Sequence, residues 1–376
     1  MKILHVITSL NEGGAEAVLV SLCSKSKSDF EHVVVSMTSG GKYKALLLNE
    51  SILVEELGMN PGSLDFSALI KLTRLIRYHK PDIVQTWMYH SNLIGSIAAR
   101  LAGVRKVLWS IHNNALVRGV DKSSTILVSK LCSWLSFFVP KRIIYCARSS
   151  SKTHEKLGYN SKVSHLIHNG YDIEKFFPNS SLRSQFRESV GCQPRNLLIG
   201  FVGRFSPAKD HENLFSALEQ NKREGMKFKC CLAGQGISRN NNELTSLIDK
   251  HNLSNEIILL GSRSDVERVM NGLDIHVLPS VTEAFPNVLC EAMACGTPCI
   301  STDVGDARLI ISRTGWIVPK SDSKSLADAL SQASLEAESP GEWEQRRQNC
   351  RERIVRNYSI DSMVLAYTDV WQTTAN

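Results

Sequence analysis

A regular alternation of short apolar runs with longer helical patterns constrains the fold most. Residues 2–9 (KILHVITS) have the composition of a β-strand, and residues 15–26 (AEAVLVSLCSKS) carry the apolar spacing of a helix. Residues 32–39 (HVVVSMTS) begin the next strand. Strands that alternate with helices predict a parallel sheet wrapped by helices, which is an α/β fold.

The alternation occurs twice along the chain. The first series continues through the β-rich runs 82–87, 106–112, 142–147 and 163–169. Turn residues then dominate 169–181, and a second series opens at Asn196. The 376 residues are also too many for one ordinary core. We therefore predict two tandem Rossmann-like, doubly wound domains, at 1–175 and 176–358, with a closing helix at about 359–376 that packs back on the first domain.

The doubly wound architecture also predicts where a ligand binds. In open parallel sheets, ligands bind at the carboxyl ends of the strands, where the following helices present their N-termini. Two such domains that face each other would form a cleft. Functional side chains are therefore expected at the strand-to-helix turns.

Composition is that of a globular protein, with 43% hydrophobic and 22% charged residues. The net charge of +7 is unevenly spread, because residues 1–170 hold 21 Lys and Arg against 11 acids, and residues 171–376 hold 23 against 26. A basic N-terminal half indicates an anionic partner such as a phospholipid surface, a nucleic acid or a phosphorylated substrate. A solvated basic surface without a partner is the alternative.

Cysteine usage and apolar runs bear on the cellular compartment. The ten cysteines include no C-x-x-C pair. Cys290, Cys295 and Cys299 lie in an apolar stretch, where small buried residues are favoured over a zinc site. The N-terminal apolar run is too short for a signal peptide, and the run 126–139 is interrupted by Lys130. We expect a cytoplasmic protein with reduced thiols and no bound metal.

The segment 282–298 (TEAFPNVLCEAMACGTP) places two acids around a proline. Because Pro is favoured as a first helical residue, a helix is expected to start at Pro286. Glu283 then precedes the helix, and Glu291 lies roughly 7 to 8 Å along its axis, so both acids are expected to border one pocket. The amides that open into this pocket belong to Asn287, Val288 and Leu289. The alternative is one capping acid and one solvent-facing acid.

A second turn supplies positive charge. In residues 201–211 (FVGRFSPAKDH), Arg204 follows a strand that ends at Gly203, and Lys209 precedes a helix. Arg and Lys at the carboxyl end of a strand suit a diphosphate. Two cations and two acids together favour a nucleotide sugar as ligand, whereas two surface cations in a loop are the alternative.

Weaker signals lie at other strand ends. Gly13 and Gly14 join the first strand to the first helix, where glycines allow close approach of a ligand to the backbone. His112 ends a strand of the first series, and Gly234 and Gly236 end one of the second. The sequence has no serine-hydrolase elbow, Walker loop, H-E-x-x-H or RNA-binding aromatic motif, so no nucleic-acid partner is predicted.

These motifs, in this order and spacing, resemble glycosyltransferase family 4. The resemblance is carried by GGAE at 13–16, His112, the pair Arg204 and Lys209, GQG at 234–236, and Glu283-x7-Glu291. It implies the GT-B fold and transfer of a sugar from a nucleotide diphosphate donor to an acceptor hydroxyl. It further implies retention of the anomeric configuration, without a metal or other cofactor.

The resemblance also implies roles at matching positions. Arg204 and Lys209 would neutralise the donor diphosphate, and His112 would contact the sugar and help to stabilise the oxocarbenium-like state. Glu283 would bind the sugar hydroxyls and Glu291 those of the ribose. The rest of the donor site would comprise Gly13, Gly14, Gly234, Gly236, Phe285, Asn287, Val288 and Leu289. No side chain is an evident general base, and in this family the leaving phosphate is proposed to take the acceptor proton.

Residues 85–103 resemble, in particular, bacterial members that build O-antigen or capsular polysaccharide on undecaprenyl diphosphate. This likeness implies a UDP-linked hexose or N-acetylhexosamine donor, a lipid-linked saccharide acceptor, and peripheral contact with the cytoplasmic face of an anionic inner membrane. Candidates for the basic docking face are Lys71, Arg74, Arg77, Lys80, Arg105 and Lys106. Trp134, Phe137 and Phe138 either enter the membrane interface or belong to a buried helix.

Two other functions are compatible with the same motifs. A nucleotide-sugar 2-epimerase on a similar two-domain fold would convert UDP-sugars without an acceptor. A non-catalytic protein would bind nucleotide sugars or polysaccharide without turning them over.

Overall fold

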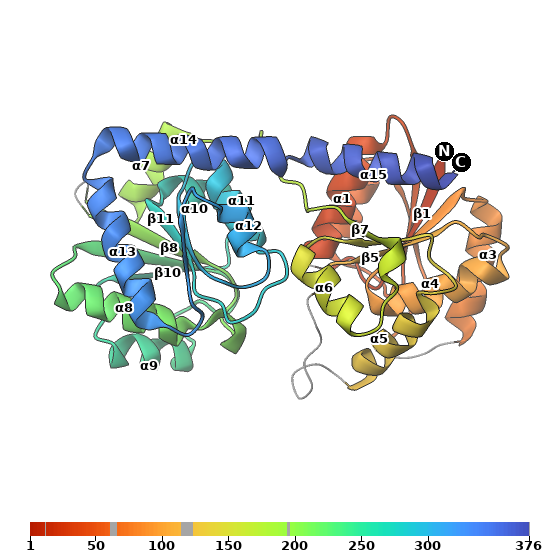
Figure 1. Ribbon diagram of the computed structural model, residues 1–376, viewed down its shortest axis with the longest axis horizontal. Coiled ribbons are helices and arrows are strands. Elements are labelled where there is room, and N and C mark those ends of the chain that lie inside the picture. The colour runs from red at the N-terminus through yellow and green to blue at the C-terminus, as the bar shows by residue number, and fades with distance from the viewer. Residues whose placement is uncertain (12, 61–65, 114–122, 194–195, 376) are drawn as a thin grey trace. The chain divides into compact units, whose positions relative to one another are not determined.

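The computed structural model describes residues 1–11, 13–60, 66–113, 123–193 and 196–375. The chain divides into two compact units (Figure 1). Unit 1 consists of Met1–Gly170 with Ile360–Asn376, and unit 2 is Tyr171–Ser359. The sequence prediction placed the two boundaries at 175 and 358. The chain therefore leaves unit 1 at Gly170 and returns to it for the closing helix.

Unit 1 is built on a seven-stranded sheet whose order is β3-β2-β1-β4-β5-β6-β7. Its strands are β1 (Lys2–Ile7), β2 (Glu31–Ser36), β3 (Leu53–Glu56), β4 (Ile83–Trp87), β5 (Val107–Ile111), β6 (Arg142–Tyr145) and β7 (Ser164–Leu166). Every neighbouring pair is parallel. Strands β1, β4 and β5 are almost wholly buried, as expected of central strands covered on both faces.

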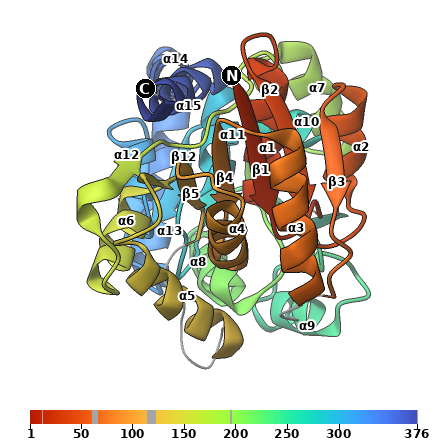
Figure 2. The same ribbon diagram turned by 90° about the vertical axis from the view of Figure 1, so that its right-hand side faces the viewer.

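Helices cover both faces of this sheet. They are α1 (Gly14–Ser26), α2 (Lys42–Asn49), α3 (Phe66–His79), α4 (Tyr89–Leu101), α5 (Ser123–Leu135), α6 (Arg148–Lys156) and α15 (Ile360–Ala375), with a 3₁₀ turn η1 at Ser161–Val163. One core forms between the sheet and α3, α4 and α5, which lie side by side in Figure 2. The other forms between the sheet and α1 and α15.

The closing helix α15 belongs to unit 1. Its Trp371 is fully buried, and the indole Nε1 donates a hydrogen bond of 2.7 Å to Oε1 of Gln85 on β4. Trp371 also lies edge-on to Phe30, with ring centroids 5.1 Å apart. A buried aromatic ring with its N–H satisfied fixes this helix to the sheet.

Unit 2 repeats the plan with six strands in the order β10-β9-β8-β11-β12-β13. The strands are β8 (Leu197–Val202), β9 (Phe228–Ala233), β10 (Ile257–Gly261), β11 (Ile275–Leu278), β12 (Cys299–Thr302) and β13 (Trp316–Val318). The helices are α7 (Ser180–Ser189), η2 (Pro207–Lys209), α8 (His211–Arg223), α9 (Asn242–Lys250), α10 (Val266–Gly272), α11 (Asn287–Ala294), α12 (Ala307–Ile311), α13 (Ser323–Ala337) and α14 (Pro340–Asn357). All described strand pairs are parallel.

The strand order reverses once in each sheet, between β1 and β4 in unit 1 and between β8 and β11 in unit 2. Such a switch point sends the two flanking crossovers to opposite sides, which leaves a crevice at the carboxyl ends of the strands. The predicted fold class, two doubly wound parallel α/β domains, is confirmed.

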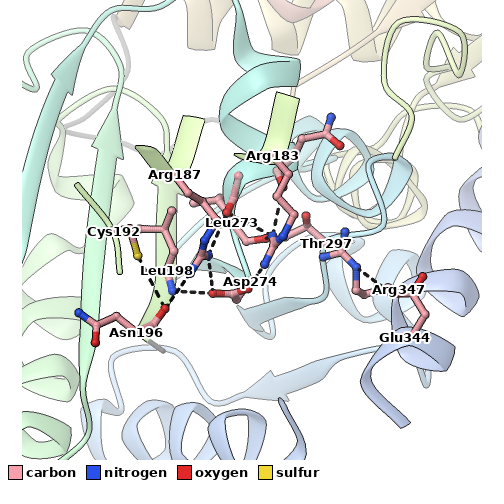
Figure 3. A network of polar contacts seen from close by, with 12 residues as sticks. Arg183, Arg187, Cys192, Asn196, Leu198, Leu273, Asp274, Thr297, Glu344 and Arg347 are labelled. Atoms are coloured by element: carbon pink, nitrogen blue, oxygen red, sulfur yellow. Dashed lines mark hydrogen bonds and ion pairs between the residues drawn. The ribbon is translucent and has the colours of Figure 1, made fainter. Parts of the chain in front are cut away.

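A buried ion-pair network joins the N-terminal ends of β8 and β11 (Figure 3). Asp274 accepts hydrogen bonds from the Leu198 amide at 2.7 Å, from Arg187 Nη1 at 2.8 Å and from Arg183 Nη2. Burial by itself would raise the pKa of Asp274, but the two guanidinium groups outweigh burial and the pKa is lowered. The carboxylate is therefore ionised at neutral pH and holds the N-terminal ends of the two central strands.

Three further observations concern the length and hydrophobicity of the helices, the cysteines and the aromatic residues in and after α5. In the described part of the chain, no helix combines the length and the hydrophobicity needed to cross a bilayer. All ten cysteines are buried and free of disulfides. Trp134, Phe137 and Phe138 are exposed, so the alternative that they belong to a buried face is wrong.

Candidate active site

Two glycine turns pack against each other at the carboxyl ends of β8 and β9. The Phe205 amide donates to the Gln235 carbonyl at 2.8 Å. Gly234 has φ +147°, and a Cβ on it would lie 2.0 Å from the Gly203 carbonyl oxygen. Gly236 also has a positive φ, of +78°. Only glycine leaves room for this close contact between the two turns. The contact therefore fixes the backbone just before the predicted cations, Arg204 and Lys209.

The predicted cations follow directly. Arg204 is exposed, and Lys209 ends the 3₁₀ turn η2. The next residue, Asp210, adopts a left-handed conformation with φ 46° and caps α8 through the Asn213 amide at 3.3 Å. Ser321 donates to the other Asp210 oxygen at 3.1 Å. The sharp turn at Asp210 thus lies between Lys209 and a capped helix.

Lys209 forms an ion pair with Glu283. Lys209 Nζ lies 2.5 Å from Glu283 Oε1, and the Ser280 hydroxyl donates to the same oxygen at 2.7 Å. Both ionised side chains are more than four-fifths buried. The Val281 amide donates to the Ala208 carbonyl at 2.9 Å and ties the two loops together. Two groups predicted for the site, 74 residues apart, are therefore in direct contact.

The helix after Glu283 begins one residue later than predicted. Helix α11 starts at Asn287, and Pro286 is its N-cap with an extended backbone. The Leu289 amide, predicted to be open, donates to the Pro286 carbonyl at 3.1 Å, because the first turn is tightened. The Val288 amide precedes any possible α-helical acceptor, as in every helix start.

Glu291 lies on α11 in a different electrostatic environment from Glu283. The side chain is half-buried, and desolvation raises its pKa to about 7. Lys175 opposes this increase and the carboxylate of Glu267 adds to it. Lys175 and Glu267 lie 3.7 Å apart as an ion pair. The charges that influence Glu291 thus come from α10 and the segment before α7, which the sequence pattern did not indicate.

Three aromatic residues support the loop between Glu283 and α11. Tyr171 stacks on Phe285 with ring centroids 6.4 Å apart, and its hydroxyl donates to Asn287 Oδ1 at 2.6 Å. Tyr358 contacts the other side of Phe285, at 5.8 Å between centroids. The backbones of Tyr171 and Tyr358 are joined by a 2.9 Å hydrogen bond. Sequence reasoning did not identify Tyr171, because its partner is 116 residues away.

Two buried histidines lie near Lys209. Burial, and secondarily the positive charge of Lys209, lower the pKa of His211 to about 4 and that of His276 to about 3. The His211 ring packs between Phe201 and Phe205, with centroids 4.7 and 4.9 Å away. Both imidazoles are therefore neutral at physiological pH and add no charge beside Lys209. Neither was predicted for the site.

Gly13 and Gly14 belong to unit 1. Gly13 is the N-cap of α1 with an extended backbone, φ −168°. Any residue can adopt this conformation, so the backbone does not require a glycine here. A Cβ there would lie 2.3 Å from Oε2 of Glu16. Burial raises the pKa of Glu16. The glycine thus leaves room for an acid in the first turn of the helix.

His112 follows β5 in unit 1. Its ring stacks on Trp87, with centroids 5.2 Å apart and an interplanar angle of 19°. Burial lowers the pKa of His112 to about 4, although Asn169 opposes this decrease. The imidazole is therefore neutral at physiological pH, and a positive charge on it cannot be assumed in any mechanism.

One group of potential metal ligands lies elsewhere in unit 1. Among the described residues, His5, Cys23 and His32 bring three such groups within 4.8 Å of one another. Trp87 Nε1 donates to His5 Nδ1 at 3.2 Å, so neutral His5 carries its proton on Nε2 and donates to His32 Nδ1 at 3.1 Å. His32 Nε2 then donates to Ser26 at 2.9 Å. This directed chain occupies the ring nitrogens and indicates a structural role.

Comparison with known proteins agrees with this geometry. Two family models match consecutive parts of the chain: Glycosyltransferase Family 4 over residues 12–175 and Glycosyl transferases group 1 over residues 183–352. The first lies in unit 1 except for its last five residues, and the second lies in unit 2. Together with the two doubly wound domains, these matches identify a glycosyltransferase of the GT-B type. The chain belongs to glycosyltransferase family 4.

Two relatives and a solved structure match most of the chain. The Escherichia coli protein "UDP-Gal:alpha-D-GlcNAc-diphosphoundecaprenol alpha-1,3-galactosyltransferase" is 28% identical over 82% of this chain and 79% of its own. Putative glycosyltransferase EpsF from Bacillus subtilis strain 168 is 27% identical over 80% and 79%. The crystal structure of Anabaena Alr3699/HepE in complex with UDP has a TM-score of 0.85 at 22% identity and covers 99% of this chain and 100% of that chain.

The Tyr171 hydroxyl generates the first prediction. Tyr171→Phe keeps the ring on Phe285 but removes the hydrogen bond to Asn287, worth about 1 kcal/mol. We expect KM for the sugar donor to rise about fivefold while kcat and the melting temperature stay nearly unchanged, because the loop loses its support before the donor binds. Steady-state kinetics check this.

Tyr358→Phe is the matched control for this prediction. Its hydroxyl donates a long hydrogen bond of 3.4 Å to the Leu309 carbonyl on α12. KM should not change in this variant. A decrease in kcat at constant KM in Tyr171→Phe would contradict a role in positioning the loop.

The raised pKa of Glu291 generates a second prediction. A folded-state pKa of about 7, above the ordinary value of 4.5, means that the folded protein retains a proton that the unfolded chain loses. The stability contributed by neutral Glu291 is complete below pH 4.5 and falls as the pH rises to about 7. Glu291→Gln mimics the neutral form at every pH.

The melting temperatures of the wild type and of Glu291→Gln should therefore diverge with pH. We expect the variant to gain up to about 2 kcal/mol relative to the wild type between pH 4.5 and 7. Thermal unfolding of the ligand-free proteins across this range measures the difference. A constant offset between the two curves would show that the pKa of Glu291 is ordinary.

Proposed function

We propose that this glycosyltransferase moves a hexose or N-acetylhexosamine from a UDP-sugar to a hydroxyl of an undecaprenyl diphosphate-linked saccharide, with retention of configuration. The observation that carries the proposal is the pairing of Lys209 with Glu283 at the switch point of unit 2, one turn away from Arg204. Cations for a diphosphate and an acid for sugar hydroxyls stand together there.

The charge at this turn suits a diphosphate. Lys209 is balanced by one acid, and among the described residues Arg204 has no ion-pair partner. His211 and His276 remain neutral at physiological pH. Arg204 therefore carries a positive charge without a paired acid among the described residues, and a sugar diphosphate would neutralise it. As the bond to the diphosphate breaks, the same side chains would stabilise the charge that develops on the leaving group.

This arrangement supports a metal-independent reaction. In transferases that use Mg²⁺, the ion neutralises the diphosphate, whereas here Arg204 and Lys209 are placed to do so. The two nearby histidines are poorly suited to take a proton from an acceptor hydroxyl, because their pKa values are lowered to about 4 and about 3. We propose that the leaving phosphate takes the acceptor proton.

Glu283 would bind the donor sugar. Ser280 and Lys209 share one carboxylate oxygen, Oε1, and orient the group. A carboxylate fixed in this way accepts hydrogen bonds from sugar hydroxyls with little loss of conformational entropy. Glu291 would accept those of the ribose, and the Val288 and Asn287 amides at the start of α11 would contact phosphate.

The proposed donor and acceptor draw on the relatives. The printed name of the Escherichia coli relative specifies UDP-Gal and a diphosphoundecaprenol-linked GlcNAc. A Staphylococcus aureus relative, 26% identical over 71% of this chain and 70% of its own, is named a capsular polysaccharide biosynthesis glycosyltransferase. We therefore propose a role in O-antigen or capsular polysaccharide synthesis, in the cytoplasm and peripherally at the inner membrane.

Nucleotide binding followed by product analysis tests the function. We expect UDP, and not GDP, to raise the melting temperature, and transfer to be detected by mass spectrometry when the protein is incubated with a synthetic lipid-diphosphate sugar and pooled UDP-sugars. Conversion of a UDP-sugar to its 2-epimer without acceptor would identify an epimerase. Nucleotide binding without turnover of any kind would leave a non-catalytic binding protein.

Variants of the ion pair test the mechanism. Lys209→Ala and Glu283→Ala should each lower transfer at least about 100-fold, the scale for losing one transition-state contact. Arg308→Ala is the control, because its pair with Asp303 at 2.6 Å is largely exposed and lies on α12. Its activity should match the wild type. Full activity in either site variant would remove that residue from the mechanism.

A further inference from the structure

The outward side of α5 and the turn after it expose five large apolar side chains. Together they are called the α5 face here, and they are Leu127, Leu131, Trp134, Phe137 and Phe138. Trp134, Phe137 and Phe138 are 65%, 59% and 64% exposed. Scattered single apolar residues are ordinary on a surface, but a contiguous group of this size marks an interaction site.

The spacing of these residues places them on one side of the helix. Leu127, Leu131 and Trp134 are four and three residues apart, as on one face of an α-helix. The opposite side is buried in the core of unit 1 through Val128 and Cys132. The helix is therefore anchored by one face, and the exposure of the other face is a property of the folded unit.

The turn that carries the two phenylalanines is also fixed. Arg100 on α4 donates through Nη2 to the carbonyls of Phe138 at 3.0 Å and Val139 at 3.1 Å. Trp134 and Phe138 lie 5.3 Å apart between ring centroids. The aromatic part of the α5 face is thus held in place, which lowers the entropy that docking would cost.

The surroundings of the α5 face are basic. The neighbouring helices α3, α4 and α5 contain no Asp or Glu. Residues 83–170 hold twelve Lys and Arg against two acids, which accounts for the whole positive excess of the first 170 residues. Lys130 on α5, and Lys141 and Arg142 just after the turn, are exposed.

We propose that the α5 face docks on an anionic lipid bilayer. Exposed aromatic rings bind at the headgroup level of a membrane, and flanking Lys and Arg are attracted to anionic lipids. A second copy of this chain fits less well, because a symmetric contact would bring two basic surfaces together. This inference rests on the proposed function in one respect only: the lipid-linked acceptor supplies the biological reason for docking.

The docking residues differ in part from those that the sequence suggested. Lys71 and Arg77, predicted for the basic face, donate hydrogen bonds to the Glu56 and Leu101 carbonyls and so help to fix α3. The aromatic residues that the sequence suggested for the membrane interface are exposed, and the structure adds Leu127 and Leu131 to them. Binding should therefore persist partly at high salt, where the attraction of the basic residues is screened.

Vesicle flotation tests the proposal. We expect the wild type to bind vesicles of phosphatidylglycerol and phosphatidylethanolamine and to bind pure phosphatidylcholine at least about tenfold more weakly. The triple variant Trp134→Ser, Phe137→Ser, Phe138→Ser should lose at least about tenfold in affinity for the anionic vesicles. Leu335→Ser with Leu365→Ser is the matched control, because these residues, 67% and 70% exposed, lie on α13 and α15.

Tryptophan fluorescence supplies a direct readout of insertion. Of the six tryptophans, Trp87, Trp109, Trp343 and Trp371 are buried and Trp316 is half-buried. Quenching by brominated lipids should therefore come from Trp134. Trp134→Phe should keep vesicle binding but lose most of the quenching, a result that unfolding could not mimic.

Each other outcome overturns the proposal. Binding of the wild type to neutral and anionic vesicles alike, undiminished affinity in the triple variant, or unquenched Trp134 would do so. A dimer that dissociates in the triple variant would show that the α5 face joins two copies instead. UDP binding without vesicle binding refutes only the docking, and vesicle binding without nucleotide binding refutes only the proposed function.

Discussion

The parallel pairing of β8 with β11 is the constraint on which the candidate site depends. These strands are adjacent at the switch point although their paired positions are 76 residues apart in the sequence, since His276 is opposite Gly200 and Ile275 is opposite Ile199. Because parallel strands end at the same edge of a sheet, the loops that follow them must meet. Lys209 and Glu283 form an ion pair for that topological reason. The Asp274 network secures the same two strands at their other end.

The sequence predicts those parts of the fold and site that depend on interactions between residues close together in the chain. Strand-to-helix turns are local, so their alternation indicated both doubly wound sheets and placed Arg204, Lys209 and Glu283 at strand ends. The predicted start of α11 was wrong by one residue, because a proline such as Pro286 is suited both to the N-cap and to the first helical position. The partners of Glu291 and Tyr171 could not be predicted, because they are set by packing between distant segments.

Charge is divided between two tasks in this chain. Residues 171–376, which contain Arg204 and Lys209, hold 23 Lys and Arg against 26 acids, so the positive charge at the switch point is local. Lys209 is paired with Glu283 there. Residues 83–170 carry the positive excess of the first 170 residues, and in the described part Lys130, Lys141 and Arg142 are exposed. A localised charge in a partly buried site acts at short range with little screening, whereas a spread surface charge acts on an extended partner and weakens with salt. The two patterns thus suit a small anion and a surface.

The ion pair explains how a site for an anion can stay folded when it is empty. A buried ammonium group without a counter-ion is costly, and Glu283 supplies one at 2.5 Å in the ligand-free protein. Ser280 binds the same oxygen, so the carboxylate would keep a donor if Lys209 turned toward a diphosphate. The proposed donor could therefore use the cation and the acid together, since neither group would lose all its hydrogen bonds when the sugar diphosphate entered.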